Sequence, residues 1–255
     1  MGNKRIGITS EFVSLIKSRE DKRYEWFISK KTRNLYKITS KIFPKKSLKK
    51  LFDERILLSK KFEKKIKGYN PKQIVEIGCG YDLKGFTLSK KNPGIIFIDI
   101  DFEEIIDNKK RILEKICKDA EIKFPINYHL ISANMIRDEL NERLNGIINK
   151  NKKTLLLAEG LTTYFNKKDF EVFMDNLLKF MKKNKNSAFF SHEPVEEDKT
   201  ITYKILRNIL KIITLNKSHK RFRNEKELRK YLEIKGFNDV KIFKSEKQMF
   251  YSIKG

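Results

Sequence analysis

Hydrophobic residues recur along this chain in two patterns that alternate with each other. Short apolar runs, each typical of a buried strand, occupy residues 73–77, 94–100, 128–132, 154–158 and 187–191. Between them, residues 83–90, 102–117 and 168–181 carry apolar side chains at helical spacing. Strands that alternate with helices predict a parallel sheet with helices on both of its faces.

The two ends of the chain depart from this alternation. Residues 8–16, 24–42 and 47–67 are basic, amphipathic stretches that predict three helices. Near the other end, a predicted helix over 225–235 precedes two strands, at 239–243 and 248–253. The turn between these strands is so short that they must pair antiparallel. A parallel sheet that ends in an antiparallel hairpin is typical of class I methyltransferases and argues against a dinucleotide dehydrogenase.

We therefore predict an α/β fold with a Rossmann-like sheet, an antiparallel C-terminal hairpin and an N-terminal helical cap. The cap is expected over residues 1–70 and the sheet domain over residues 71–255. Residues 193–224 show no sheet pattern, so we expect them to be an insertion that covers a substrate.

Composition narrows the classes of protein that fit. Hydrophobic residues make up 39% of the 255, enough to build a core. No apolar run approaches the roughly 20 residues that span a bilayer, and no apolar stretch follows the first residues as in a secretory signal. The expectation is a cytoplasmic protein with no membrane partner. The two cysteines and three scattered histidines do not suggest a zinc site, and we expect no metal.

The formal net charge of +25 is large enough to attract nucleic acid. The lysines are spread over the whole length and are not gathered in one block. This spread favours compositional bias over a dedicated nucleic-acid surface, although both interpretations stay open.

The first strand leads into a glycine-rich turn. Gly78 and Gly80 follow it, and they would let the backbone approach a ligand closely. The dinucleotide-binding motif requires a third glycine to accommodate the pyrophosphate, but Leu83 occupies that position in this chain. An adenosyl ligand without phosphate does not need that glycine. The alternative is a tight turn between strand and helix with no ligand.

Polar residues follow three more strands, where the ligand crevice of an open α/β sheet lies. Asp101 comes about 20 positions after the glycines, where a carboxylate can accept hydrogen bonds from ribose hydroxyls, or else cap the next helix. Asn134 could hydrogen-bond an adenine amino group while Met135 packs on the ring. Glu159 follows a buried strand and needs a cationic partner, either a ligand ammonium or a lysine or arginine.

Taken together, residues 73–82, 99–104 and 157–165 resemble the leucine carboxyl methyltransferase family, which includes bacterial O-methyltransferases of polyketide-type pathways. The resemblance implies S-adenosyl-L-methionine as cofactor and S-adenosyl-L-homocysteine as product. It places Gly78 under the methionine portion, Asp101 on the ribose, and Asn134 and Met135 beside the adenine. It also places Glu159 near the amino group.

The resemblance further implies an arginine that grips the cofactor carboxylate, and Arg55 stands at the matching spacing. This chain departs from the family at other positions. Asp82-Leu83-Lys84 replaces the usual Asp-Thr-Arg, and Glu103 replaces a proline. Asn134 replaces an aspartate. These departures weaken any transfer of substrate from the family.

The predicted activity is methyl transfer to a carboxylate or hydroxyl of a small, polyketide-like molecule or of a protein C-terminus. His192, expected just after the fifth strand, is the candidate catalytic base for a hydroxyl acceptor. Tyr24, Trp26 and Phe27 are expected to form part of the lid. One alternative is an RNA methyltransferase that stacks bases on Tyr24, Trp26 and Tyr36, and another is a non-catalytic module that binds the cofactor.

Overall fold

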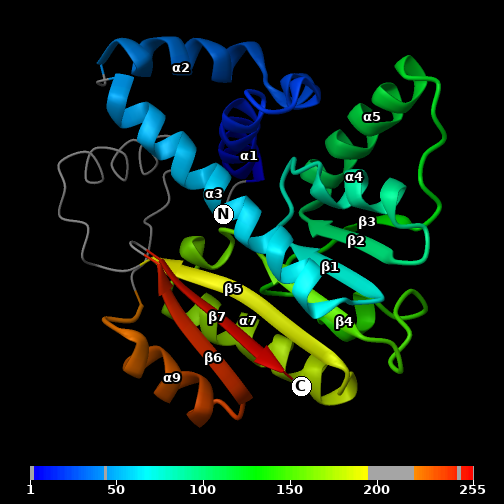
Figure 1. Cartoon of the computed structure of the whole chain (residues 1–255), viewed down its shortest axis with the longest axis vertical. Helices are drawn as coiled ribbons and strands as arrows, with labels where there is room; N and C mark the ends of the chain where they lie inside the picture. The colour runs from blue at the N-terminus through cyan, green and yellow to red at the C-terminus, as the bar shows by residue number, and fades with distance from the viewer. Residues whose placement is uncertain (1–2, 43–44, 195–220, 246–247, 255) are drawn as a thin grey trace.

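A computed structural model describes residues 3–42, 45–194, 221–245 and 248–254, which form a seven-stranded sheet with helices around it (Figure 1). The strand order is β3-β2-β1-β4-β5-β7-β6. The strands are β1 (Gln73–Ile77), β2 (Ile96–Asp101), β3 (Tyr128–Ser132), β4 (Thr154–Ala158), β5 (Ser187–Pro194), β6 (Asn238–Ser245) and β7 (Gln248–Lys254). The first five run parallel, and β7 pairs antiparallel with both β5 and β6. The predicted fold class is confirmed.

The sheet separates two hydrophobic cores. The helices that follow the first strand are α4 (Lys84–Lys91), α5 (Glu103–Asp119), α6 (Leu140–Arg143), α7 (Lys167–Lys183) and α9 (Glu225–Ile234). Phe173 of α7 and Leu228 of α9 lie in the core on one face, and Phe86 of α4 and Leu113 of α5 lie in the core on the other. Alternate residues of each strand point to opposite faces, so every parallel strand supplies both cores.

The N-terminal segment contains α1 (Asn3–Lys17), a 3₁₀ helix η1 (Lys22–Phe27), α2 (Lys30–Ile42) and the long α3 (Lys45–Tyr69). The single helix predicted over residues 24–42 is wrong, because η1 ends before α2 begins. The reason lies in α1, where the Glu11 carboxylate accepts hydrogen bonds from Ser29 N at 3.0 Å and Thr32 Oγ1 at 2.6 Å. This contact with α1 fixes the start of α2, and the spacing of apolar residues in the sequence gives no sign of it.

The fifth strand is longer than predicted and extends to Pro194. The short α6 and the 3₁₀ helix η2 (Thr162–Tyr164) were not predicted. Residues 195–220, most of the predicted insertion, lie outside the described residues. Within the part of the chain that is described, no helix combines the length and apolarity needed to cross a membrane.

Candidate active site

The glycine turn after β1 has a backbone shape that favours glycine. Gly78 has φ 69° and Gly80 has φ 51°, both in the left-handed region. Gly78 N donates to the carbonyl of Ile100 at 2.8 Å, so the turn is fastened to the end of β2. A Cβ on Gly78 would lie 2.8 Å from Leu161 Cδ1, and one on Gly80 would lie 2.8 Å from Ser10 Oγ of α1. The turn is therefore packed closely on both sides.

Asp101 is the last residue of β2, and its buried carboxylate contacts this turn. Its Oδ2 accepts from Gly80 N at 2.7 Å, and its Oδ1 accepts from Phe102 N at 2.8 Å. Burial raises the pKa of Asp101, while the two backbone hydrogen bonds oppose that rise. Phe102, not Asp101, occupies the N-cap position of α5. The Asp101 carboxylate thus connects the end of β2 to the turn after β1, two segments that the sequence predicts at one ligand site.

Asp99, two residues earlier, has a different environment. Its carboxylate accepts from Lys109 Nζ of α5 at 2.7 Å and from the Tyr128 hydroxyl. Both charged side chains are completely buried. This ion pair joins α5 to the sheet and leaves Asp101 as the carboxylate at the strand end.

A buried charge cluster lies beside the glycine turn and consists of Lys17, Glu76, Asp82, Lys84 and Glu159. One oxygen from each carboxylate lies within 4.8 Å of the others. Lys84 Nζ is 2.8 Å from Glu76 Oε1, 3.0 Å from Glu159 Oε2 and 3.6 Å from Asp82 Oδ2. Lys17 Nζ lies 2.5 Å from Asp82 Oδ2 and 4.0 Å from Glu159 Oε1. Three negative and two positive groups therefore share one small volume.

The pKa values follow from this crowding. Burial raises the pKa of Glu76 to about 7, against the attraction of Lys84. Burial would also raise the pKa of Asp82, but Lys17 and Lys84 hold it well below its usual value. Burial lowers the pKa of Lys84, yet its three carboxylate neighbours raise it well above normal. Near neutral pH, the charge cluster therefore gains one negative charge when Glu76 loses its proton.

Three close carboxylates are also a set that binds metal ions. The Lys84 ammonium already lies within 3.0 Å of two of them, and the Lys17 ammonium contacts the third. A metal ion would have to displace both cations, so we assign no metal to this cluster.

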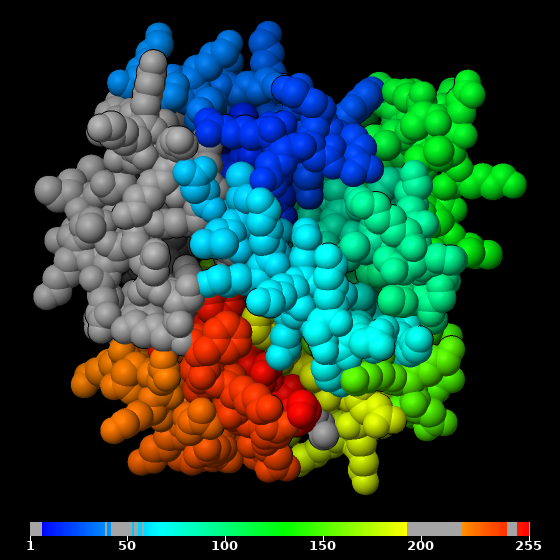
Figure 2. Space-filling model, in the orientation of Figure 1, coloured from blue at the N-terminus to red at the C-terminus, as the bar shows by residue number. Residues whose placement is uncertain are grey.

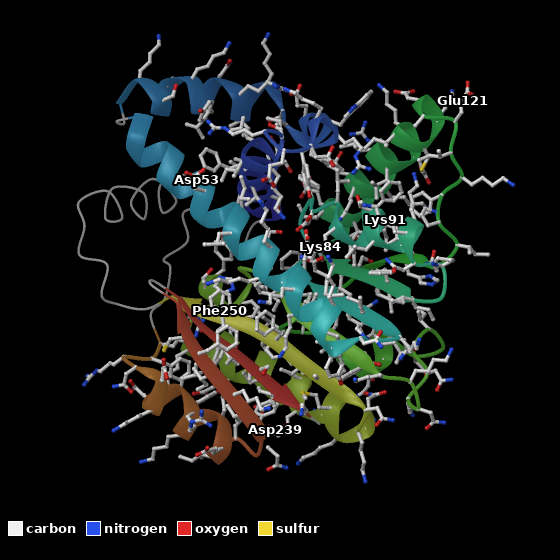
Figure 3. The ribbon with its side chains drawn as sticks, viewed as in Figure 1. Asp53, Lys84, Lys91, Glu121, Asp239 and Phe250 are labelled. Atoms are coloured by element: carbon white, nitrogen blue, oxygen red, sulfur yellow. The ribbon has the colours of Figure 1, made fainter. Side chains whose placement is uncertain are left out.

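Two members of this site come from the N-terminal segment. Lys17 is the last residue of α1, and its ammonium also donates to Ser59 Oγ of α3 at 3.1 Å. The Tyr24 hydroxyl donates to Asp82 Oδ1 at 2.7 Å and accepts from Leu83 N at 3.1 Å. Tyr24 is buried, so it orients Asp82 and has no free face for stacking. Figure 3 labels Lys84 at the start of α4, beside α3.

The segment after β3 forms a tight turn near Asp101. Ala133 N donates to the carbonyl of Asp101 at 2.8 Å, which brings the ends of β2 and β3 together. Asn134 Oδ1 accepts from Ile136 N at 3.1 Å, so part of its acceptor capacity is used locally. Met135 is buried and packs into the core on the α7 face.

The last two predicted residues are His192 and Arg55. His192 lies within β5, opposite Phe250, and the prediction that it follows the strand is wrong. Its buried ring meets Phe62 edge-on, with 5.8 Å between ring centroids. The Thr162 hydroxyl of η2 donates to its backbone carbonyl at 3.2 Å. Arg55 lies on α3, and its side chain is outside the described residues.

Sequence reasoning missed Lys17, Tyr24 and Lys84 as members of the site. Lys84 carried a signal, because it occupies the position of the arginine in the Asp-Thr-Arg pattern. In this structure Glu159 pairs with Lys84, a cation of this chain, and its role toward a ligand ammonium stays a prediction.

Comparison with known proteins gives one matching family and several solved structures of similar fold. Residues 20–178, well over half of the chain, match the family described as leucine carboxyl methyltransferase. Similar solved structures include PigF with SAH, with 12% identity and a TM-score of 0.51 over 73% of this chain and 51% of that one. The mitomycin 7-O-methyltransferase MmcR has 9% identity and a TM-score of 0.51 over 73% and 50% of the two chains.

A third structure is an O-methyltransferase from neocarzinostatin biosynthesis, solved with S-adenosyl-L-homocysteine and 1,4-dihydroxy-2-naphthoic acid. It shares 9% identity and a TM-score of 0.50 over 73% of this chain and 50% of that one. This chain spans about half the length of the solved proteins it matches. At such low identity, the likeness establishes the fold.

Proposed function

This chain belongs to the leucine carboxyl methyltransferase family, and on that premise we propose that it is an S-adenosyl-L-methionine-dependent O-methyltransferase. The observation that carries the proposal is the position of the buried charge cluster. It adjoins the glycine turn and contains residues that follow β1 and β4, while Asp101 of β2 bonds to the same turn. The carboxyl ends of these central strands are where an open α/β sheet binds its ligand.

The charge cluster fits the amino-acid end of this cofactor. A bound zwitterion needs a carboxylate for its ammonium and a cation for its carboxylate, and the cluster offers both. We assign Glu159 to the ammonium and Lys17 to the carboxylate, with Arg55 as the second cation. Gly78 and Gly80 would pass beneath the methionine portion, and Asp101 would accept from the ribose. Asn134 and Met135 would lie beside the adenine.

The cofactor supplies a methyl group that its sulfonium already activates. The protein's residues then need to hold an acceptor oxygen in line near 3 Å and exclude water. A carboxylate acceptor needs no base, whereas a hydroxyl acceptor calls for one, and we assign that role to His192. The bound naphthoic acid in the neocarzinostatin enzyme supports a small-molecule acceptor over a protein terminus.

The alternative RNA methyltransferase has weaker support from the N-terminal helices. Of the aromatic residues proposed to stack bases there, Tyr24 is buried and Tyr36 is partly buried. Trp26 is 44% exposed, with Lys115 Nζ 4.4 Å from its ring centroid. A non-catalytic role would require binding of the cofactor without turnover of any acceptor.

Calorimetry with S-adenosyl-L-methionine tests the cofactor assignment. We expect Asp101→Ala to weaken affinity at least tenfold, because a charge-assisted hydrogen bond contributes about 1.5–3 kcal/mol. The control is Asp107→Ala, which removes an exposed carboxylate from α5 and should leave affinity unchanged. Absence of binding to the wild type at millimolar cofactor would end the proposal. Equal cofactor affinities of the two variants would show that Asp101 does not bind the ribose.

The Lys17 assignment has its own test. Lys17→Met should weaken cofactor binding about tenfold by removing a buried cation from the cofactor's carboxylate. The control is Lys22→Met, whose side chain is 86% exposed on η1. Tighter binding by Lys17→Met would mean that this ammonium competes with the cofactor for Asp82 and Glu159, contrary to the assignment.

A further inference from the structure

Among the described residues, no helix packs over β6 and β7 on the sheet face that carries α3 (Figure 1). Helix α9 packs on the opposite face, where Leu228 and Leu232 join Val240 of β6 in one core. Figure 1 shows no helix in front of β6 and β7, and Figure 2 shows their atoms at the surface beside α3. Phe243, on β6, is 44% exposed. A large aromatic side chain is thus exposed on this open face.

Three nearly parallel phenylalanine rings stand on this face. The centroids of Phe243 and Phe250 are 5.3 Å apart with an interplanar angle of 4°. Phe190 lies 6.0 Å from Phe250 and 6.1 Å from Phe243, with an angle of 17° to each. The three centroids lie 5.3 to 6.1 Å apart and form a triangle, so the rings are a cluster rather than a linear stack. Phe190 and Phe250 are buried, and Phe243 is the exposed member of this cluster.

Lysines surround these rings from three elements. Lys61 Nζ of α3 lies 4.6 Å from the Phe250 ring centroid, and Lys65 Nζ lies 5.3 Å from that of Phe190. Lys241 of β6 and Lys254 of β7 are exposed at the same face. We call the set of Lys61, Lys65, Lys241, Phe243 and Lys254 the basic aromatic face.

The charges of this face are poorly balanced. Burial lowers the pKa of Lys65, and repulsion from Lys241 and Lys254 lowers it further, while Asp239 opposes them. Asp239 is paired with Lys254 at 2.9 Å, and Figure 3 labels this residue, which lies near the start of β6. Lys65, Lys241 and Lys254 thus repel one another despite Asp239, and a bound polyanion would relieve this repulsion.

We propose that the basic aromatic face binds a single strand of nucleic acid, with phosphates on the four lysines and a base stacked on Phe243. Proteins that bind single strands combine cationic grooves with aromatic rings in this way, because every base has a face that can stack. A second copy of this chain fits poorly, because each copy carries a formal net charge of +25. An acidic membrane needs several protruding apolar side chains, and Phe243 is the exposed large one on these two strands among the described residues.

This face is separate from the charge cluster that would bind the cofactor. The residues of the face belong to α3, β6 and β7, whereas the charge cluster is built at the ends of β1 and β4 and on α1. A competing account is that edge-strand lysines simply prevent pairing with other sheets. That account does not require the lysines on α3 or the exposed ring.

Fluorescence anisotropy with a labelled 12-nucleotide single-stranded RNA, recorded over a salt series on the full chain, tests the proposal. Lys65→Gln/Lys241→Gln should weaken binding and flatten the slope of log affinity against log salt by about 1.4, the value for two lost phosphate contacts. The control, Lys182→Gln/Lys183→Gln, removes the same charge from exposed positions on α7 and should leave the slope almost unchanged.

The stacking role is tested with the aromatic residues. Phe243→Ala should weaken binding about tenfold and Phe243→Trp should restore it, since loss of one stacked base has an effect of this order. Trp26→Ala is the matched control, because Trp26 is also 44% exposed beside a lysine. The proposal is overturned if the control variants lose as much affinity for RNA as the test variants. It is also overturned if the wild type does not bind RNA and binds anionic vesicles instead. Cofactor affinity should stay constant throughout, which separates this result from the proposed methyl transfer.

Discussion

Substitution of Lys84 by methionine should destabilise the fold strongly, and more so as pH rises. Lys84 Nζ makes contacts of 2.8 and 3.0 Å to Glu76 and Glu159, and all three side chains are buried. Methionine keeps most of the apolar stem but leaves the carboxylates facing one another. Removing one partner of a buried ion pair costs about 3–5 kcal/mol, because the remaining charge stays desolvated.

The pH dependence follows from the same geometry. In the wild type, burial already raises the pKa of Glu76 to about 7, and loss of the Lys84 charge should raise it further. A carboxyl whose folded pKa lies above its unfolded value stabilises the fold at low pH, and this stability is lost as pH rises through the folded pKa. Between the unfolded and the folded pKa, the loss is about 1.4 kcal/mol per pH unit for this group.

Urea titrations at pH 6 and pH 8 measure this effect as the free energy of unfolding. Lys179→Met is the control, because its ion pair with Glu139 has the same 2.8 Å distance but is exposed, and should contribute little to stability. Adding Glu76→Gln to Lys84→Met should recover part of the loss at pH 8. A destabilisation no larger than that of the control, and equal at both pH values, would refute the reasoning.

Two further predictions concern Glu76 and Gly80. In the wild type, the free energy of unfolding should fall as pH rises from about 5 through 7, because Glu76 has a raised folded pKa. Urea titrations of Glu76→Gln should no longer show this fall. If the fall persists in Glu76→Gln, another group causes it. Gly80→Ala should cost about 1–3 kcal/mol in the same assay, because its φ is left-handed and its Cβ would lie 2.8 Å from Ser10 Oγ. Adding Ser10→Gly to Gly80→Ala should recover only the steric part of this loss. If Gly80→Ala alone leaves the free energy of unfolding unchanged, α1 does not pack closely on the turn.

The centre of the sheet was predictable because its strands β1 and β4 are buried on both faces. The apolar runs over 73–77, 128–132 and 154–158 coincide with the observed bounds of β1, β3 and β4. A strand covered by helices on both sides carries mostly apolar residues, and that pattern is local. The break between η1 and α2 is different, because Glu11 of another helix creates it.

The site was predictable only where its residues follow strands. The bond between Gly80 and Asp101 joins two residues that the sequence had placed at one ligand site. Lys17 carries no such mark, because it is one of 58 lysines and arginines and lies 65 positions before its partner Asp82. Its role depends on where α1 packs, which no spacing rule in the sequence reveals.

These contacts also bear on the predicted division of the chain at residue 70. Lys17 and Tyr24 lie before that point, whereas Asp82 and Glu159 lie after it, and the described contacts between them are buried. A sheet domain separated from the first 70 residues would lose the Lys17 and Tyr24 contacts of Asp82 and keep only Lys84, at 3.6 Å, beside that carboxylate. The N-terminal helices are therefore more than a cover over a finished site, because they supply part of its charge. For this reason we expect the cap and the sheet to fold and bind the cofactor as one unit.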